Sequence, residues 1–224
     1  MQDEGISPDV GTFLCTLKAC QIIGKVEVGE EIYGQIRKHG LLEKDIAVGT
    51  ALVDMYAKLG ALEKAQEVFH ELPLRDVSSW TALISGYVEH GFDDLALNCF
   101  KLMRNEGLSP DAVTFTCVLK ACGNKGSLEI GEEIYAEVQK QGLLAKNMVL
   151  SNALLDMYVK CGSLARAQET FEALPVKNVI SWTVLIMGYA QQGFGDKAMA
   201  FFQQMVNDGL SPDGVTFICI LQAC

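Results

Sequence analysis

Pairs of polar side chains recur along this chain of 224 residues, and their types suit hydrogen bonding to a ligand. The first member is threonine or asparagine in five places and leucine in one: Leu14, Thr50, Thr81, Thr116, Asn152 and Thr183. The second member is always aspartate or asparagine: Asp45, Asp76, Asp111, Asn147, Asn178 and Asp213. An ionised aspartate only accepts hydrogen bonds, whereas an asparagine amide also donates them, so these pairs could distinguish donors from acceptors. Aspartate and asparagine also suit a turn or a helix N-cap, and the two roles can coexist.

The paired residues belong to a sequence repeat with a period of 102 residues. The segment EGLSPDAVTFTCVLKAC at Glu106 has close copies at Glu4 and Asp208. Each period divides into units of 36, 31 and 35 residues, and the pairs occupy position 5 and the last position of each unit. The expected units are 1–9 (the end of a 35-residue unit), 10–45 (long), 46–76 (short), 77–111 (35 residues), 112–147 (long), 148–178 (short), 179–213 (35 residues) and 214–224 (the first helix of a further long unit). Because the chain starts and stops within a unit, we expect it to be a piece of a longer array.

Each unit has the pattern of two helices joined by a turn. Trp80, Leu83, Ile84 and Tyr87 follow the i, i+3, i+4, i+7 spacing of an amphipathic helix. Position 15 of all six complete units is glycine, which can end a helix in the left-handed conformation. A second apolar stripe follows, and helix pairs of this size must stack on one another to bury it. We therefore predict an all-α fold, an α-solenoid of helix–turn–helix repeats.

Composition narrows the possible functions. Lys and Arg total 18 against 28 Asp and Glu, a formal net charge of −10. This balance argues against a generic polyanion binder but leaves room for a local basic track. No apolar run is long enough to span a bilayer, so we expect no membrane association. Six of the eight cysteines form C-x4-C pairs, whose members point to different helix faces and make a poor metal clamp. We expect them to be buried or half-buried thiols in a reducing compartment.

Catalytic motifs are missing from the sequence. None of the three histidines, His39, His70 and His90, begins the H-x-E motif of zinc deaminases, and there is no C-x-x-C. The phosphate-binding sequence GxxxxGK[ST] is also missing. We therefore expect no enzyme activity, no cofactor and no metal ion.

Several segments recur in register and carry a resemblance to a known family. They are SWTALISGY from Ser79, VTFTCVLKACGNKGSLEIGEEIY from Val113 and ALLDMYVKCGSLARAQETFEALP from Ala153. Together with the 36/31/35 spacing, they make the whole chain closely resemble pentatricopeptide repeat proteins of the plant PLS class. The resemblance implies a right-handed superhelix that binds single-stranded RNA, one base per repeat, in mitochondria or chloroplasts. Many such proteins direct cytidine-to-uridine editing and associate with a multiple organellar RNA editing factor protein. A targeting peptide would then lie upstream of Met1.

The same resemblance assigns a base to each polar pair. In the family, threonine at position 5 accompanies purines and asparagine accompanies pyrimidines. An aspartate suits the N1–H of guanine or the N3–H of uracil, whereas an asparagine suits the acceptors N1 of adenine and N3 of cytosine. The predicted core is therefore 5′-N-G-G-A-C/U-G-3′, in which Leu14 and Asp45 give the unselective first base. The long units of the class follow the code less well, so the adenine is the less strict assignment.

Two further sets of residues complete the predicted site. Positions 2 and 5 fall off the apolar stripe when residues are spaced by about 100° around the first helix. In three units position 2 is an aliphatic residue of the kind that the family uses to sandwich a base, although packing between repeats, or a β-branched residue ahead of the helix start, would also explain it: Val113, Val149 and Ile180. Lys58 and Lys160 match a lysine that the family uses near phosphates, and the alternative is a solvated residue at a helix end.

A protein-interaction scaffold is the main rival for the function as a whole, because an acidic surface is natural for one. The unpaired terminal helices could also allow end-to-end self-association.

Overall fold

The computed structural model describes residues 8–223, and all regular structure within that range is helical. The unit predicted at 1–9 lies mostly outside the described residues, as does Cys224. The chain divides into two compact units, Met1–Thr114 and Phe115–Cys224, and each is described by itself. The N-terminal unit contains α1 (Val10–Ile23), α2 (Val26–Lys38), α3 (Leu41–Lys44), α4 (Ile46–Lys58), α5 (Leu62–Glu71), α6 (Val77–Glu89), α7 (Asp93–Asn105) and the start of α8 (Ala112–Lys125). The C-terminal unit contains the rest of α8, then α9 (Leu128–Lys140), α10 (Met148–Lys160), α11 (Leu164–Ala173), α12 (Val179–Gln191), α13 (Gly195–Asn207) and α14 (Gly214–Ala223).

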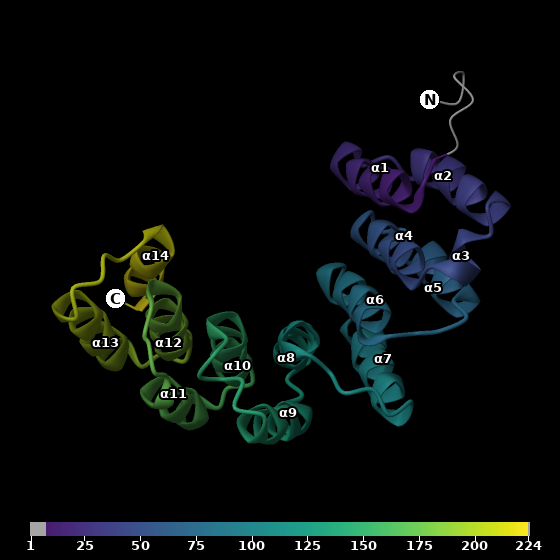
Figure 1. Cartoon of the computed structure of the whole chain (residues 1–224). Coiled ribbons are helices and arrows are strands. Elements are labelled where there is room, and N and C mark those ends of the chain that lie inside the picture. Colours follow the sequence, from purple (N-terminus) through teal and green to yellow (C-terminus); the bar gives the residue numbers. More distant parts are fainter. Residues whose placement is uncertain (1–7, 224) are drawn as a thin grey trace. The chain divides into compact units, whose positions relative to one another are not determined.

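Within each unit, the first helices of successive repeats form a row. In the N-terminal unit α1, α4 and α6 pack side by side, and in the C-terminal unit α10, α12 and α14 do the same (Figure 1). The second helices, such as α5 and α11, pack against the helix before them and the helix after them. Because one face of a second helix meets solvent, these helices are amphipathic, whereas first helices such as α6 bury residues on most of their faces. The predicted helical repeat solenoid is confirmed.

Glycine ends the first helix of every complete repeat, as predicted. The φ angle lies between +68° and +79° at Gly24, Gly60, Gly91, Gly126, Gly162 and Gly193. A side chain would strain the backbone at these angles, so glycine fixes where the turn between the two helices begins. The one-turn helix α3 was not predicted, and the corresponding residues 144–146 of the C-terminal unit form a turn.

A buried tryptophan anchors each of the two 35-residue repeats. Trp80 Nε1 donates a hydrogen bond to Glu106 Oε2 at 3.0 Å. The buried Nε1 of Trp182 has no such partner among the described residues. The residue that corresponds to Glu106 in this repeat is Asp208, whose side chain is one methylene group shorter. The two repeats therefore differ in how completely they satisfy the indole N–H.

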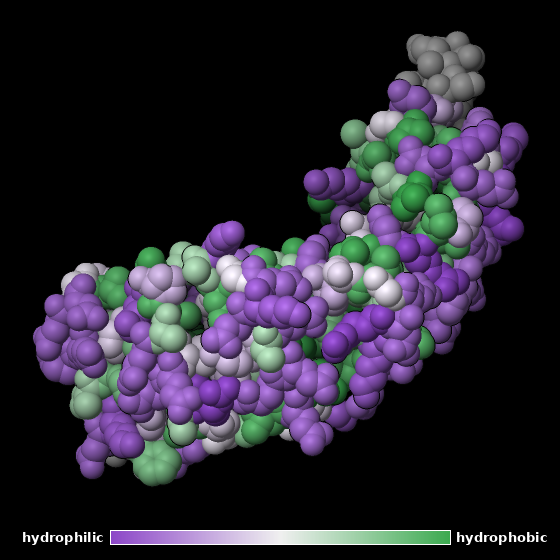
Figure 2. Space-filling model, turned by 60° about the horizontal axis from the view of Figure 1, so that its bottom comes forward, coloured by the Kyte–Doolittle hydropathy of each residue, from purple (hydrophilic) through white to green (hydrophobic). Residues whose placement is uncertain are grey.

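The surface of the described chain is mixed in character. Figure 2 shows a face on which hydrophilic residues predominate and hydrophobic ones gather in small groups between them. Within residues 8–223, none of the helices combines the length and the apolar character needed to cross a membrane. The thiols are buried or half-buried as predicted at Cys20, Cys99, Cys117, Cys122, Cys161 and Cys219. Cys15 is exposed, because it lies about 140° around α1 from Cys20 and points away from the neighbouring helices.

Candidate functional site

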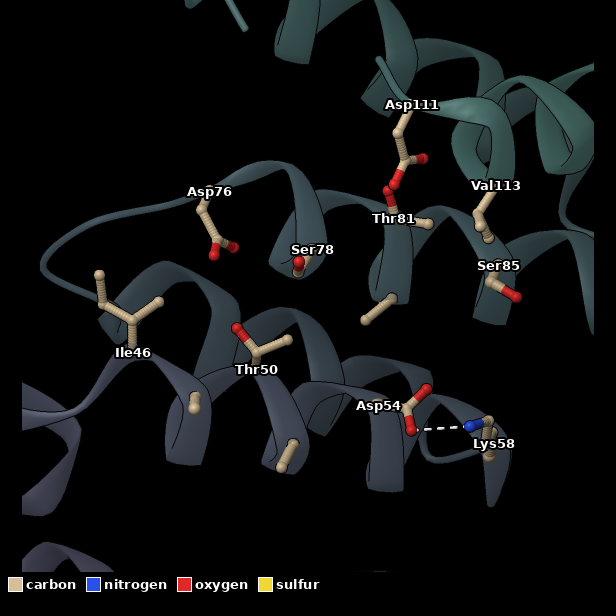
Figure 3. A pocket seen from close by; sticks show the side chains of 13 residues that line it. Ile46, Thr50, Asp54, Lys58, Asp76, Ser78, Thr81, Ser85, Asp111 and Val113 are labelled. Atoms are coloured by element: carbon tan, nitrogen blue, oxygen red, sulfur yellow. Dashed lines mark hydrogen bonds and ion pairs between the residues drawn. The ribbon is translucent and has the colours of Figure 1, made fainter. Parts of the chain in front are cut away.

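A groove in the N-terminal unit collects most of the ligand-binding residues predicted for that unit. It lies between α4, α6 and the start of α8 and has a volume of about 780 Å³. Its lining includes four predicted base-reading residues, one predicted stacking residue and one predicted phosphate-binding residue: Thr50, Asp76, Thr81, Asp111, Val113 and Lys58. The remaining lining residues are Ile46, Ala47, Ala51, Asp54, Ser78, Ala82 and Ser85. Figure 3 shows these side chains on facing sides of a shared space, which we call the α4–α6 groove.

Every last-position residue caps the helix that follows it. The Oδ1 atoms accept backbone N–H groups at 2.8–3.0 Å as follows: Asp45 from Ala47, Asp76 from Ser79, Asp111 from Thr114, Asn147 from Leu150, Asn178 from Ser181 and Asp213 from Thr216. These hydrogen bonds satisfy backbone donors that a helix start otherwise leaves unpaired. The capping role, predicted from the sequence beside the ligand-reading role, is confirmed.

Capping fixes which atom of the side chain remains available. With Oδ1 on the helix, an aspartate is left with Oδ2, which only accepts, and an asparagine is left with Nδ2, which only donates. Asn178 illustrates the second case, because its Nδ2 donates to Met148 Sδ at 3.2 Å while its Oδ1 accepts from Ser181. The choice between aspartate and asparagine at this position therefore changes the free atom from acceptor to donor without changing the cap.

The hydrogen bonds at a cap also favour the ionised form of Asp213 and Asp9. The backbone N–H of Thr216, followed by its hydroxyl, lowers the pKa of Asp213 below the ordinary value of 3.8. In the same way, the hydroxyl and then the backbone N–H of Thr12 lower the pKa of Asp9. At neutral pH such a side chain presents a charged acceptor.

Two of the position-5 threonines lie deeper than the sequence predicted. Thr81 and Thr183 were expected off the apolar stripe, but they are only 8% and 7% exposed. Their hydroxyl oxygens lie 2.6 Å and 2.7 Å from those of Thr114 and Thr216, the third residues of the next repeats. The expectation was wrong here because the first helix of the following repeat covers that side. Thr114 and Thr216 were missed by sequence reasoning, although threonine recurs at this position.

The other position-5 residues are partly exposed: Leu14, Thr50, Thr116 and Asn152. Leu14 lines a hollow of about 270 Å³ that adjoins the α4–α6 groove, since Asp54 and Lys58 line both. Asn152 lines a hollow of about 210 Å³ beside Met148. The hydroxyl oxygen of Thr50 is buried and has no hydrogen-bond partner among the described residues.

The position-2 residues face solvent. Val113, Val149 and Ile180 are 58%, 67% and 58% exposed, which argues against packing between repeats as their role. The structure places Val113 in the lining of the α4–α6 groove.

The predicted phosphate-binding lysines are ion-paired within their own helices. Lys58 Nζ lies 2.7 Å from Asp54 Oδ2, and Lys160 Nζ lies 2.8 Å from Asp156 Oδ2. Both pairs have the i, i+4 spacing that allows contact on one helix face. The two aspartates were missed by sequence reasoning, although their spacing from the lysines was visible. In the α4–α6 groove, Lys58 is the single cation beside the carboxylates of Asp54, Asp76 and Asp111.

Comparisons with known proteins agree with one another. A model described as the PPR repeat family matches residues 75–124 and 177–224, and a model described as the PPR repeat matches residues 50–77, 113–143 and 149–179. An Arabidopsis thaliana protein named as a mitochondrial pentatricopeptide repeat-containing protein is 34% identical over 224 residues, covering 100% of this chain and 36% of its own length. A second one, named as chloroplastic, is 39% identical over 213 residues, covering 95% of this chain and 34% of its own length.

The fold also resembles solved structures. The crystal structure of the pentatricopeptide repeat protein PPR10 in complex with an 18-nt psaJ RNA element aligns with a TM-score of 0.68 at 18% identity, covering 100% of this chain and 38% of PPR10. PPR10 from maize, in a second crystal structure, aligns with a TM-score of 0.64 at 18% identity, covering 99% of this chain and 37% of that one. The chain thus spans about a third of the length of the curated relatives described above.

Proposed function

Because the chain belongs to the pentatricopeptide repeat family, we propose that it binds single-stranded RNA with one base per repeat. The repeats of this proposal are the units from 10–45 to 179–213 predicted from the sequence. One observation carries it: in the α4–α6 groove, Thr50 and Thr81 lie beside the capping residues Asp76 and Asp111, each of which keeps one oxygen free of its cap. The free oxygen would meet the Watson–Crick edge of an unpaired base.

The free atoms support the predicted order of bases. A free carboxylate oxygen at Asp76, Asp111 or Asp213 suits the N1–H of guanine. An amide nitrogen outside the cap suits the acceptor N1 of adenine at Asn147 and the acceptor N3 of cytosine at Asn178, where one of its two hydrogens points to Met148 Sδ and the other would serve the base. The proposed core remains 5′-N-G-G-A-C/U-G-3′, with Leu14 and Asp45 at the unselective base.

Stacking and phosphate contacts would be weaker contributions. The exposed side chains of Val113, Val149 and Ile180 would rest against the faces of bases. Lys58 and Lys160 would approach phosphates only by leaving their aspartates. With two such contacts, log K would fall by about 1.4 for each tenfold rise in salt, since each single-strand contact contributes about 0.7.

The comparisons support an organellar setting for this proposal. PPR10 was crystallised with RNA, and the relatives carry mitochondrial or chloroplastic names. We place this protein in one of these organelles as a non-catalytic binder of RNA. The 36/31/35 spacing supports the PLS class, and with it target recognition for cytidine-to-uridine editing and association with a multiple organellar RNA editing factor protein.

The acidic groove favours one rival, a scaffold that binds another protein. A gel shift separates the two, using an unstructured oligonucleotide that carries G-G-A-C-G and a second one with A in place of the second G. RNA recognition requires tighter binding of the first probe, by about tenfold for one mismatched polar contact. Equal binding of both probes would contradict the proposed base recognition. If neither probe binds, the protein-interaction scaffold becomes the favoured function.

A further inference from the structure

Where the third residue of a repeat is threonine, as at Thr114 and Thr216, its hydroxyl contacts the polar pair of the repeat before it. We propose that the third residue, threonine at these two places and serine at Ser79, decides whether the position-5 hydroxyl of the preceding repeat is free to bond RNA. Thr50 and Thr81, although identical in type and both followed by aspartate, would then read their bases differently. The inference rests on the proposed RNA binding and adds a positioning residue to it.

Thr114 holds the hydroxyl of Thr81 away from the groove. The two hydroxyl oxygens are 2.6 Å apart, and Thr114 Oγ1 is 2.8 Å from Asp111 Oδ1. Thr81 Oγ1 also lies 2.7 Å from the carbonyl oxygen of Val77. Figure 3 shows the oxygen of Thr81 turned toward Asp111. Thr114 itself is fully buried, so its hydroxyl can serve only protein groups.

The number of hydroxyl hydrogens limits which oxygen can donate in each of these contacts. Two hydroxyl hydrogens serve three short contacts, so one contact has no hydrogen of its own. The carboxylate of Asp111 and the carbonyl oxygen of Val77 can only accept, so Thr114 donates to Asp111 and the single hydroxyl hydrogen of Thr81 serves Val77 or Thr114. This relay of hydroxyl contacts ends on a carboxylate, and its last hydrogen bond is charge-assisted and therefore strong. With its hydroxyl in the relay, Thr81 retains only a methyl group for contact with a ligand.

The C-terminal unit contains the same relay. Thr183 Oγ1 lies 2.7 Å from Thr216 Oγ1, which lies 2.8 Å from Asp213 Oδ1. Thr216 is fully buried, like Thr114. The arrangement is therefore a regular feature of the 35-residue repeats that precede a threonine.

Serine at the third position behaves differently. Ser79 Oγ accepts from the backbone N–H of Asp76 at 3.0 Å and donates to its carbonyl oxygen at 2.9 Å, which completes a capping box. Its hydroxyl is therefore committed to the backbone and does not reach Thr50. The oxygen of Thr50, which has no partner among the described residues, points in Figure 3 toward the side of the groove where Asp76 and Ser78 lie. This oxygen is buried in the unbound protein, so a base would reach it only after the side chain of Thr50 turns toward the groove, but no described protein group holds it in a hydrogen bond.

The test removes each hydroxyl without changing side-chain shape. Binding to the G-G-A-C-G probe is measured for Thr50→Val and Thr81→Val, with thermal melting as a check that both variants are folded. Thr50→Val should weaken binding about five- to tenfold, the effect of losing one hydrogen bond, and Thr81→Val should weaken it by a clearly smaller factor, because protein groups already hold the Thr81 hydroxyl. Equal losses in the two variants would overturn the proposal.

Thr114→Ser tests the role of the third residue directly. The change deletes one methyl group and keeps a hydroxyl that can turn to the backbone as Ser79 does. In this background Thr81→Val should become costly, by about the factor seen for Thr50→Val. If Thr81→Val keeps its smaller effect there, the third residue does not control the hydroxyl, although RNA binding by the unaltered chain would still stand. Failure of the unaltered chain to bind the probe would instead remove the proposed function and this inference together.

Discussion

Replacement of Asp111 by asparagine should change the preferred base without changing the fold. Asp111 Oδ1 accepts both the backbone N–H and the hydroxyl of Thr114, each at 2.8 Å. An asparagine can keep both contacts through its own Oδ1, as Asn178 does with the backbone N–H of Ser181. The atom left for a ligand then changes from a carboxylate oxygen to an amide nitrogen, that is, from an acceptor to a donor.

The size of the effect follows from one hydrogen-bond mismatch at a partly desolvated edge. A polar atom that faces a group of the same kind costs about 1–3 kcal/mol, and about 1.4 kcal/mol is a factor of ten in affinity. Guanine at the third base should therefore lose about 5- to 150-fold in affinity when Asp111 becomes asparagine. Adenine, which offers the acceptor N1, should gain over the same range.

The assay is fluorescence anisotropy with four probes that differ only at the third base, accompanied by thermal melting of each protein variant. Asparagine caps a helix about as well as aspartate, so the melting temperature should be nearly unchanged. Asp111→Ala is the matched control, because it removes the cap at a cost of about 1 kcal/mol and should weaken guanine binding without improving adenine binding. A folded Asp111→Asn protein that keeps its preference for guanine would refute the reasoning.

Two other substitutions test the groove charge and the core. Asp54→Asn should release Lys58 from its 2.7 Å ion pair, raise RNA affinity and steepen the salt dependence of log K by about 0.7, whereas Glu67→Gln on α5 removes the same charge away from the groove and should do neither. Identical salt slopes for the two variants would mean that Lys58 makes no phosphate contact. Asp208→Glu should give the buried Nε1 of Trp182 an acceptor and raise the melting temperature by about 2–4 °C, a gain of about 1 kcal/mol, and an unchanged or lower melting temperature would contradict it.

The sequence was sufficient to predict the helices and their turns because these depend on local chemistry. Glycine is the residue that adopts the left-handed conformation at the lowest cost, and the φ angles of +76° at Gly60 and +78° at Gly91 agree with its recurrence at position 15. The prediction of a cap at Asp76 or Asn178 succeeded for the same reason, since short polar side chains reach the N–H groups three residues ahead.

The depth of Thr81 could not be predicted from one helix considered alone. A helical wheel divides residues into a buried stripe and an exposed remainder, but a first helix in a stacked array has a neighbour on each side. The helix that begins at Ala112 covers the face on which Thr81 lies, and Thr114 supplies its hydrogen-bond partner. Contacts of this kind join residues 33 positions apart, and no periodicity within one helix reveals them.

Because the last-position residue must cap the next helix, it can offer a base only one of two kinds of atom, an acceptor or a donor. Serine or threonine could cap the next helix, but each has a single oxygen, and none would remain for a ligand once it was committed to the backbone. Aspartate and asparagine are the two capping residues with a second polar atom, and these atoms have opposite hydrogen-bonding character. A position that must cap, as Asp111 and Asn147 do, can therefore present an acceptor or a donor and nothing else. Discrimination beyond that one choice has to come from position 5 and from the third residue that controls it.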